Sequence, residues 1–130
     1  MVIDASAIVA IFFEEPDFPK LLNVIQSAPS RLISAATRLE AGIVLDQSGA
    51  PSAEHRDRLS EFLEDLQIRV VAFSEAHAQT AREAYRRYGK GRHPAGLNFG
   101  DCMSYALAKS LDEPLLYKGT DFSLTDVRVA

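Results

Sequence analysis

The chain has 130 residues, a formal net charge of −4, and a composition that is 47% hydrophobic and 25% charged, as is usual for a globular protein. No apolar run reaches the roughly 20 residues that a membrane-spanning helix needs, and the first residues lack the basic segment of a secretory signal peptide. The single cysteine, Cys102, excludes an internal disulfide and a cysteine-based metal cluster. We therefore expect one cytoplasmic domain, residues 1–130, with no membrane as partner.

The chain opens with a short apolar strand, Val2 and Ile3, which stops at a carboxylate, Asp4. An apolar strand without polar alternation is typical of the central strands of parallel sheets, which are buried on both faces. Ser6 is expected to be the N-cap of the helix that follows.

Helical and strand-forming patterns then alternate along the chain. Helices are predicted at residues 7–13, 16–28, 37–47, 53–66, 75–88 and 98–111. Further strands are predicted at residues 31–34, 70–73 and 114–117, with a short fifth strand at 127–129, and a turn is predicted at 48–51. Strands separated by helices predict an α/β fold with a central, mostly parallel sheet of four to five strands and helices on both faces.

Four acidic residues lie at positions where an α/β sheet of this kind binds its ligands. Asp4 ends the first strand, Glu40 and Asp101 each lie about one turn into a helix, and Asp121 follows the fourth strand. Ligands of open α/β sheets gather beyond the carboxyl ends of the strands. We therefore expect the four side chains to line one edge of the sheet.

Each acid also has a purely structural explanation. Glu40 and Asp101 stand three residues after Thr37 and Asn98, which is capping-box spacing, and the other two acids could form turns. Converging carboxylates, however, repel one another unless a cation compensates them. An all-oxygen ligand set favours Mg²⁺ or Mn²⁺ over zinc, and an acidic cluster holding such a cation suits phosphate chemistry.

A basic segment follows in the second half of the chain. It carries five of the fourteen Lys and Arg residues, namely Arg82, Arg86, Arg87, Lys90 and Arg92. Such a local patch is compatible with RNA binding despite the negative total charge, and a solvated helix face followed by a charged loop is the alternative. On the same helix, Ala78, Ala81 and Tyr85 are expected to face inward.

An ordered set of motifs spans nearly the whole chain. The motifs are Val2-Ile3-Asp4-Ala5-Ser6-Ala7, then Ser34, Thr37 and Glu40, then Tyr88-Gly89-Lys90-Gly91-Arg92-His93 with Leu97-Asn98-Phe99-Gly100-Asp101-Cys102, and finally Leu115-Leu116-Tyr117-Lys118-Gly119-Thr120-Asp121-Phe122. In these residues the chain resembles the PIN-domain family, most closely the VapC-type toxins of bacterial toxin–antitoxin pairs. The resemblance implies a PIN-like three-layer fold.

The resemblance also implies an endoribonuclease that depends on Mg²⁺ or Mn²⁺ and hydrolyses RNA with a metal-activated water, leaving a 5′-phosphate and a 3′-hydroxyl. The family's acidic quartet maps onto Asp4, Glu40, Asp101 and Asp121. Asp4 and Asp101 are the expected direct metal ligands, and Glu40 and Asp121 are expected to bind through water or at a second site. Ser6 is expected to orient the first carboxylate or a metal-bound water.

Further residues follow from the same resemblance. Asn98 matches the family's polar residue ahead of the third acid, with a helix N-cap as its alternative role, and Asp126 is the only later candidate for an additional acid. The basic segment becomes the RNA-facing lip, with Arg86, Arg87, Lys90, Arg92 and Asn98 as candidate RNA contacts. Tyr85 or Tyr88 could stack on a base or could belong to the core.

The expected partners are the RNA substrate, a second copy of the chain in a homodimer, and a cognate VapB-like antitoxin. Residues 14–28 and 53–67 are the candidate antitoxin groove, enriched in apolar surface by Phe12, Phe13 and Phe18. Core packing of these rings is the alternative.

Three other functions compete with this interpretation. An Asp-based phosphatase or a receiver-like domain needs a second acid two residues after the first or a phosphoacceptor after the third strand, but Ser6 and Phe73-Ser74 stand there. A catalytically idle PIN-fold module would bind RNA or protein with its acids unused. A nuclease of the same chemistry could also act on DNA or on structured RNA.

Overall fold

The computed structural model describes residues 1–47 and 52–130, and the side chains of these except for residues 52–57; the turn predicted at 48–51 lies outside the described residues. The strands are β1 (Val2–Ile3), β2 (Leu32–Ser34), β3 (Arg69–Val71) and β4 (Leu115–Leu116). The helices are α1 (Ala5–Phe12), α2 (Phe18–Ser27), α3 (Ala35–Asp46), α4 (Ser52–Asp65), α5 (Glu75–Tyr88) and α6 (Phe99–Leu111), and a short 3₁₀ helix, η1 (Asp121–Leu124), follows β4.

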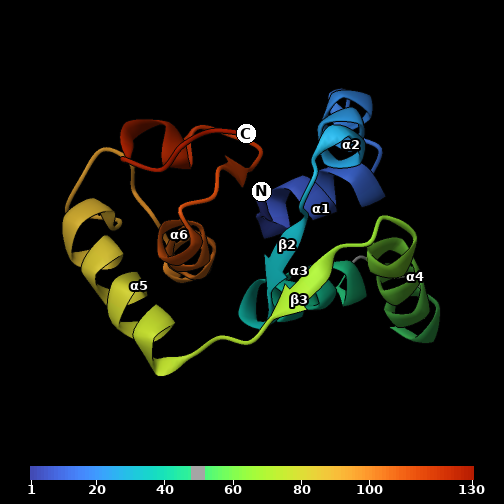
Figure 1. Ribbon diagram of the computed structural model, residues 1–130, viewed down its shortest axis with the longest axis horizontal. Coiled ribbons are helices and arrows are strands. Elements are labelled where there is room, and N and C mark those ends of the chain that lie inside the picture. Colours follow the sequence, from blue (N-terminus) through green and yellow to red (C-terminus); the bar gives the residue numbers. More distant parts are fainter. Residues whose placement is uncertain (48–51) are drawn as a thin grey trace.

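The four strands form one parallel sheet in the order β3-β2-β1-β4, which confirms the predicted α/β class. The fifth strand predicted at 127–129 is reduced to an isolated bridge between Val129 and Leu115. The chain crosses from β1 outward to β3 and then returns to place β4 beside β1 (Figure 1). This reversal makes the crevice beyond β1 and β4 the topological switch point, where open α/β sheets bind ligands.

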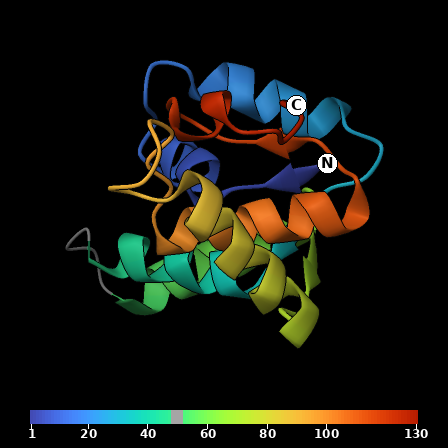
Figure 2. The ribbon, with the colours of Figure 1, turned by 90° about the vertical axis from the view of Figure 1, so that its left-hand side faces the viewer.

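Helices cover both faces of the sheet because successive strand residues point to opposite sides. Ile3 and Ile33 pack under α1 to α4, whereas Val2 and Leu32 pack under α5 and α6. Figure 2 shows α5 and α6 side by side on the face turned to the viewer. The three-layer arrangement predicted from the sequence is therefore present.

Two local predictions are wrong. Asp4, not Ser6, is the N-cap of α1, because its carboxylate reaches the backbone N–H of Ser6 and starts the helix two residues earlier. On α5 the inward face holds Ala81, Ala84 and Tyr88, whereas Ala78 and Tyr85 are exposed. No helix in the described part of the chain is long and apolar enough to span a bilayer.

Candidate active site

Asp4 lies buried at the switch point, with 3% of its surface exposed. Its backbone N–H donates to the carbonyl of Leu116 (2.9 Å), so the residue sits between the ends of β1 and β4. Its Oδ2 atom accepts from the backbone N–H of Ser6 (2.9 Å) and from the Ser6 hydroxyl (2.6 Å). The Ser6 hydroxyl accepts in turn from the backbone N–H of Lys118 (3.0 Å). Ser6 therefore ties the Asp4 carboxylate to the end of β4 and leaves Oδ1 without a hydrogen bond among the described residues.

Glu40 reaches the same region from α3. Helix α3 begins at the Ser34 cap rather than at Thr37, and the Thr37 hydroxyl is hydrogen-bonded to Ser104 in the core (3.0 Å). The capping-box explanation of Glu40 is therefore wrong, and its carboxylate has no hydrogen bond in the described part of the chain. A Cβ atom on Gly100 would stand 2.1 Å from Glu40 Oε1, so the missing side chain of Gly100 makes room for this carboxylate against the first turn of α6.

Asp101 is held by the helix end that it caps. Its Oδ2 accepts from the backbone N–H of Asn98 (2.7 Å), and the Asn98 side chain accepts from the backbone N–H of Asp101 (2.9 Å). The predicted capping box is thus present, and Asn98 is the helix N-cap. Oδ1 of Asp101 is again left without a hydrogen-bond partner in the described residues.

The charges of the four predicted acids act on one another. Burial, then Asp4 and then Asp101 raise the pKa of Glu40 to about 7. Burial, opposed by the hydrogen bond from Asn98 and reinforced by Asp4 and the exposed Asp121, raises the pKa of Asp101 to about 6. The carboxylates of Asp4, Glu40 and Asp101 therefore act on one another's charge, and Asp121 acts on Asp101. In the described part of the chain, no three acidic, histidine or cysteine side chains are arranged so that they could hold a metal ion.

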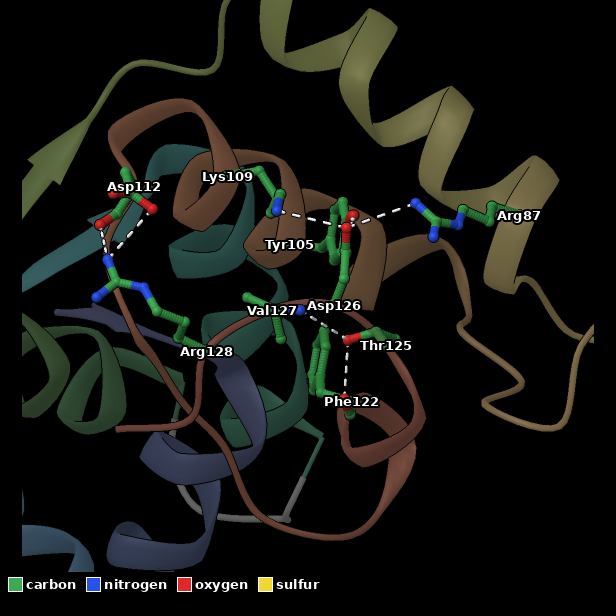
Figure 3. Close-up of polar contacts among 9 residues, drawn as sticks. All are labelled: Arg87, Tyr105, Lys109, Asp112, Phe122, Thr125, Asp126, Val127 and Arg128. Carbon is green, nitrogen blue, oxygen red and sulfur yellow. Dashed lines mark hydrogen bonds and ion pairs between the residues drawn. The ribbon is translucent and has the colours of Figure 1, made fainter.

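Asp126 belongs to a different cluster (Figure 3). Its Oδ1 accepts from the Tyr105 hydroxyl (2.6 Å), and its Oδ2 pairs with Arg87 (3.4 Å) and Lys109 (3.5 Å). These partners, chiefly the Tyr105 hydrogen bond, lower the pKa of Asp126. This carboxylate is therefore compensated by protein groups and serves to join α5, α6 and the C-terminal segment.

The candidate RNA contacts are not equivalent. Arg87 is tied to Asp126 and lies over the Tyr88 ring, 4.7 Å from its centroid. Arg86, Lys90 and Arg92 are exposed and have no ion pair in the described part of the chain. Tyr88 is buried at 5% exposure, whereas Tyr85 is 39% exposed. The core interpretation thus holds for Tyr88 only.

Two features that hold the site in place were not predicted from the sequence: the ion pairs of Lys118 and the position of Glu40 over Gly100. The Lys118 ammonium pairs with Asp17 (2.6 Å) and with Glu15, which anchors the segment whose backbone N–H holds Ser6. Gly100 was part of a recognised motif, but nothing local indicates that Glu40 passes over it. Both features depend on contacts between residues about 60 or more positions apart in the sequence.

Comparison with known proteins gives consistent results. A family model described as PIN domain matches residues 1–127. The chain is 49% identical over 128 residues to a protein named Ribonuclease VapC from Mycolicibacterium smegmatis, covering 98% of this chain and 97% of that one. It is 46% identical over 131 residues to Ribonuclease VapC28 from Mycobacterium tuberculosis, covering 100% and 97%.

Two solved structures share the fold. One is the crystal structure of Mycobacterium tuberculosis VapC20, described as a Sarcin-Ricin loop cleaving toxin, with a TM-score of 0.79 and 15% identity over 99% of this chain and 97% of that one. The other is a toxin–antitoxin complex from Klebsiella pneumoniae, with a TM-score of 0.72 and 18% identity over 99% and 95%.

Proposed function

Because this chain belongs to the PIN-domain family, we propose that it is a divalent-metal-dependent endoribonuclease and the toxin of a VapBC-type toxin–antitoxin pair in the cytoplasm. The names of its relatives support ribonuclease activity. The observation that carries the proposal is the partly buried carboxylate of Glu40, which lies over Gly100 in the first turn of α6 and has no hydrogen bond in the described part of the chain. Burial, then Asp4 and then Asp101 raise its pKa. A protein keeps such uncompensated negative charge at a functional site.

The chemical type of the donor atoms suits Mg²⁺ or Mn²⁺. The available atoms are carboxylate oxygens, which hard divalent cations prefer. Asp4 and Asp101 are each held through Oδ2, and their Oδ1 atoms accept no hydrogen bond from the described residues, so we assign them as the direct ligands. Glu40 and Asp121 would bind through water. When bound, the cation neutralises charge on the scissile phosphate and makes water a better nucleophile.

Side chains of the protein orient the metal ligands and the attacking water. Ser6 orients the Asp4 carboxylate, and Asn98 does the same for Asp101. Glu40 has no hydrogen bond in the described part of the chain, so its oxygens are available to position the attacking water and to accept its proton. Attack in line on an RNA phosphodiester would leave a 5′-phosphate and a 3′-hydroxyl.

Two exposed apolar surfaces are the candidate partner sites. For the antitoxin we favour the surface formed by α2, α4 and the end of α1, where Phe13, the C-cap of α1, is 46% exposed. Core packing holds for Phe12, which packs against the core and lies edge-on to Phe62 on α4 with ring centroids 5.3 Å apart. For a homodimer, Leu39 and Ile43 on α3 are 65% and 48% exposed. Exposed apolar surface of this kind is typical of protein interfaces.

A cleavage assay with matched variants tests the activity. Purified wild-type protein is incubated with RNA in Mg²⁺, in Mn²⁺ or in chelator, beside Asp4→Asn and Asp101→Asn. Each variant should lower cleavage by roughly 100-fold or more, as does removal of other groups that stabilise transition-state charge. Glu75→Gln, at an exposed position that begins α5, is the matched control and should cleave normally.

Two results would overturn the proposal. Cleavage that persists in chelator would exclude metal dependence. RNA binding without cleavage by the wild-type protein would instead identify the catalytically idle module. Circular dichroism of both Asn variants shows whether a loss of activity reflects unfolding.

A further inference from the structure

A cleft of about 650 Å³ lies between α5 and α6, beside the N-terminal end of α6 that carries Asp101. It is lined by Phe73, Ala78, Ala81, Arg82, Tyr85, Lys90, Asn98, Phe99, Cys102 and Met103. The volume is in the range of pockets that bind small organic groups. Asn98 lines the cleft, and its side chain accepts a hydrogen bond from the backbone N–H of Asp101, so the cleft lies beside the end of α6 that carries Asp101.

Its rim presents aromatic rings to solvent. Phe99 is 79% exposed and Tyr85 is 39% exposed. Phe99 is the first residue of α6, next to Gly100 and two residues before Asp101. An exposed ring at this position does nothing for the core, and exposed aromatic surface marks binding sites.

The same cleft carries two cationic side chains. Arg82 and Lys90 are both exposed, and neither has an ion pair in the described part of the chain. Their positive charge is a local feature, because the chain as a whole has a formal net charge of −4. Apolar walls, exposed rings and unpaired cations are the combination by which proteins bind single-stranded nucleic acid, stacking the bases and attracting the phosphates.

We propose that this cleft holds one unpaired base of the RNA, stacked against both Phe99 and Tyr85, with Arg82 and Lys90 facing the flanking phosphates. The inference rests on the proposed function and adds to it a base-binding cleft between α5 and α6. A base inside a duplex cannot reach the rings, because its neighbours already cover both its faces. A second copy of the chain is the alternative occupant, and the measurement of oligomeric state described below distinguishes it from RNA.

The test measures RNA affinity without cleavage. All proteins carry Asp4→Asn, the buffer contains chelator, and the probe is a fluorescein-labelled, unstructured RNA of about 12 nucleotides, a length typical of single-strand sites. Phe99→Ala and Tyr85→Ala should each weaken binding roughly 5- to 150-fold, the range measured for base–aromatic stacking. Leu111→Ala, an exposed position at the far end of the same helix, should leave the affinity unchanged.

An abasic scan locates the base. Removing the base at one nucleotide of the probe should weaken its binding to the Asp4→Asn protein. Removing the same base should not weaken binding any further when the protein also carries Phe99→Ala. Equal losses at every nucleotide, or unchanged affinity of Phe99→Ala and Tyr85→Ala, would overturn the proposal. A change of oligomeric state by Phe99→Ala at unchanged RNA affinity would assign the cleft to a second copy instead.

The two proposals can fail separately. If the protein with its natural Asp4 cleaves RNA and Phe99→Ala cleaves it with the same KM, the base pocket is wrong and the nuclease stands. If the protein with its natural Asp4 does not cleave RNA while Phe99→Ala still loses affinity, the pocket stands and the nuclease is wrong.

Discussion

Replacing Glu40 by glutamine should make the metal-free protein more stable at pH 8. In the wild-type chain the carboxylate is partly buried, faces Asp4 and Asp101, and has its pKa raised from 4.5 to about 7. The glutamine side chain keeps the shape and removes the charge. The variant therefore isolates the free energy that the folded protein loses by holding an uncompensated carboxylate at this place.

The sign and size follow from proton linkage. In the unfolded chain Glu40 ionises near pH 4.5, whereas in the folded protein it ionises near pH 7. Its contribution to stability is therefore fully present below pH 4.5 and is lost as the pH rises through 7. The complete loss is on the order of 2–3 kcal/mol after allowance for solvent screening, which corresponds to roughly 6–12 °C in Tm for a domain of this size.

Thermal unfolding in chelator at several pH values checks this. Glu40→Gln should unfold at a higher temperature than the wild type at pH 8 and at nearly the same temperature at pH 4.5. Glu75→Gln should follow the wild type throughout. Excess Mg²⁺ should raise the Tm of the wild type and should raise that of Glu40→Gln less. Equal or lower stability of Glu40→Gln at pH 8 in chelator would refute the reasoning about repulsion.

Three further variants probe the same site. Gly100→Ala should stabilise α6 by up to about 1 kcal/mol through helix propensity yet lower RNA cleavage, because the new methyl group takes the place of the Glu40 carboxylate; melting and cleavage are measured on one preparation. Ser6→Ala should lower kcat at least about tenfold by freeing the Asp4 carboxylate from a charge-assisted hydrogen bond, and a rate equal to the wild type would remove Ser6 from the site. Asp126→Asn should leave RNA cleavage unchanged, and a large loss of rate would place that carboxylate among the functional acids.

Features that depend on neighbours in the chain could be predicted from the sequence. The strand that ends at Asp4 is short and wholly apolar, and the capping box of Asn98 and Asp101 needs only residues three positions apart. Alternation of strands and helices predicted the parallel sheet, since parallel strands require crossover connections. These features all follow from local periodicity and local hydrogen bonding.

The α5 helix shows where such reasoning stops. Helical periodicity places Tyr85 and Tyr88 within one turn of each other, so both are compatible with an inward face. Packing against α6 buries Tyr88 and leaves Tyr85 at the cleft. The sequence pattern indicates which residues of α5 can form its buried face, and packing against α6 decides which of them are buried.

What the amino-acid sequence alone determined is the set of chemical groups and the elements that carry them: four carboxylates, a hydroxyl, and a parallel α/β frame. Only the tertiary structure decided that Glu40 lies over Gly100 without a hydrogen bond in the described part of the chain, and that Asp126 is neutralised by Tyr105, Arg87 and Lys109. The physical reason is that a carboxylate's charge depends on which distant groups surround it after folding. Glu40 and Asp126 look alike in the sequence, but in the folded protein the charge of Glu40 is uncompensated and the charge of Asp126 is compensated.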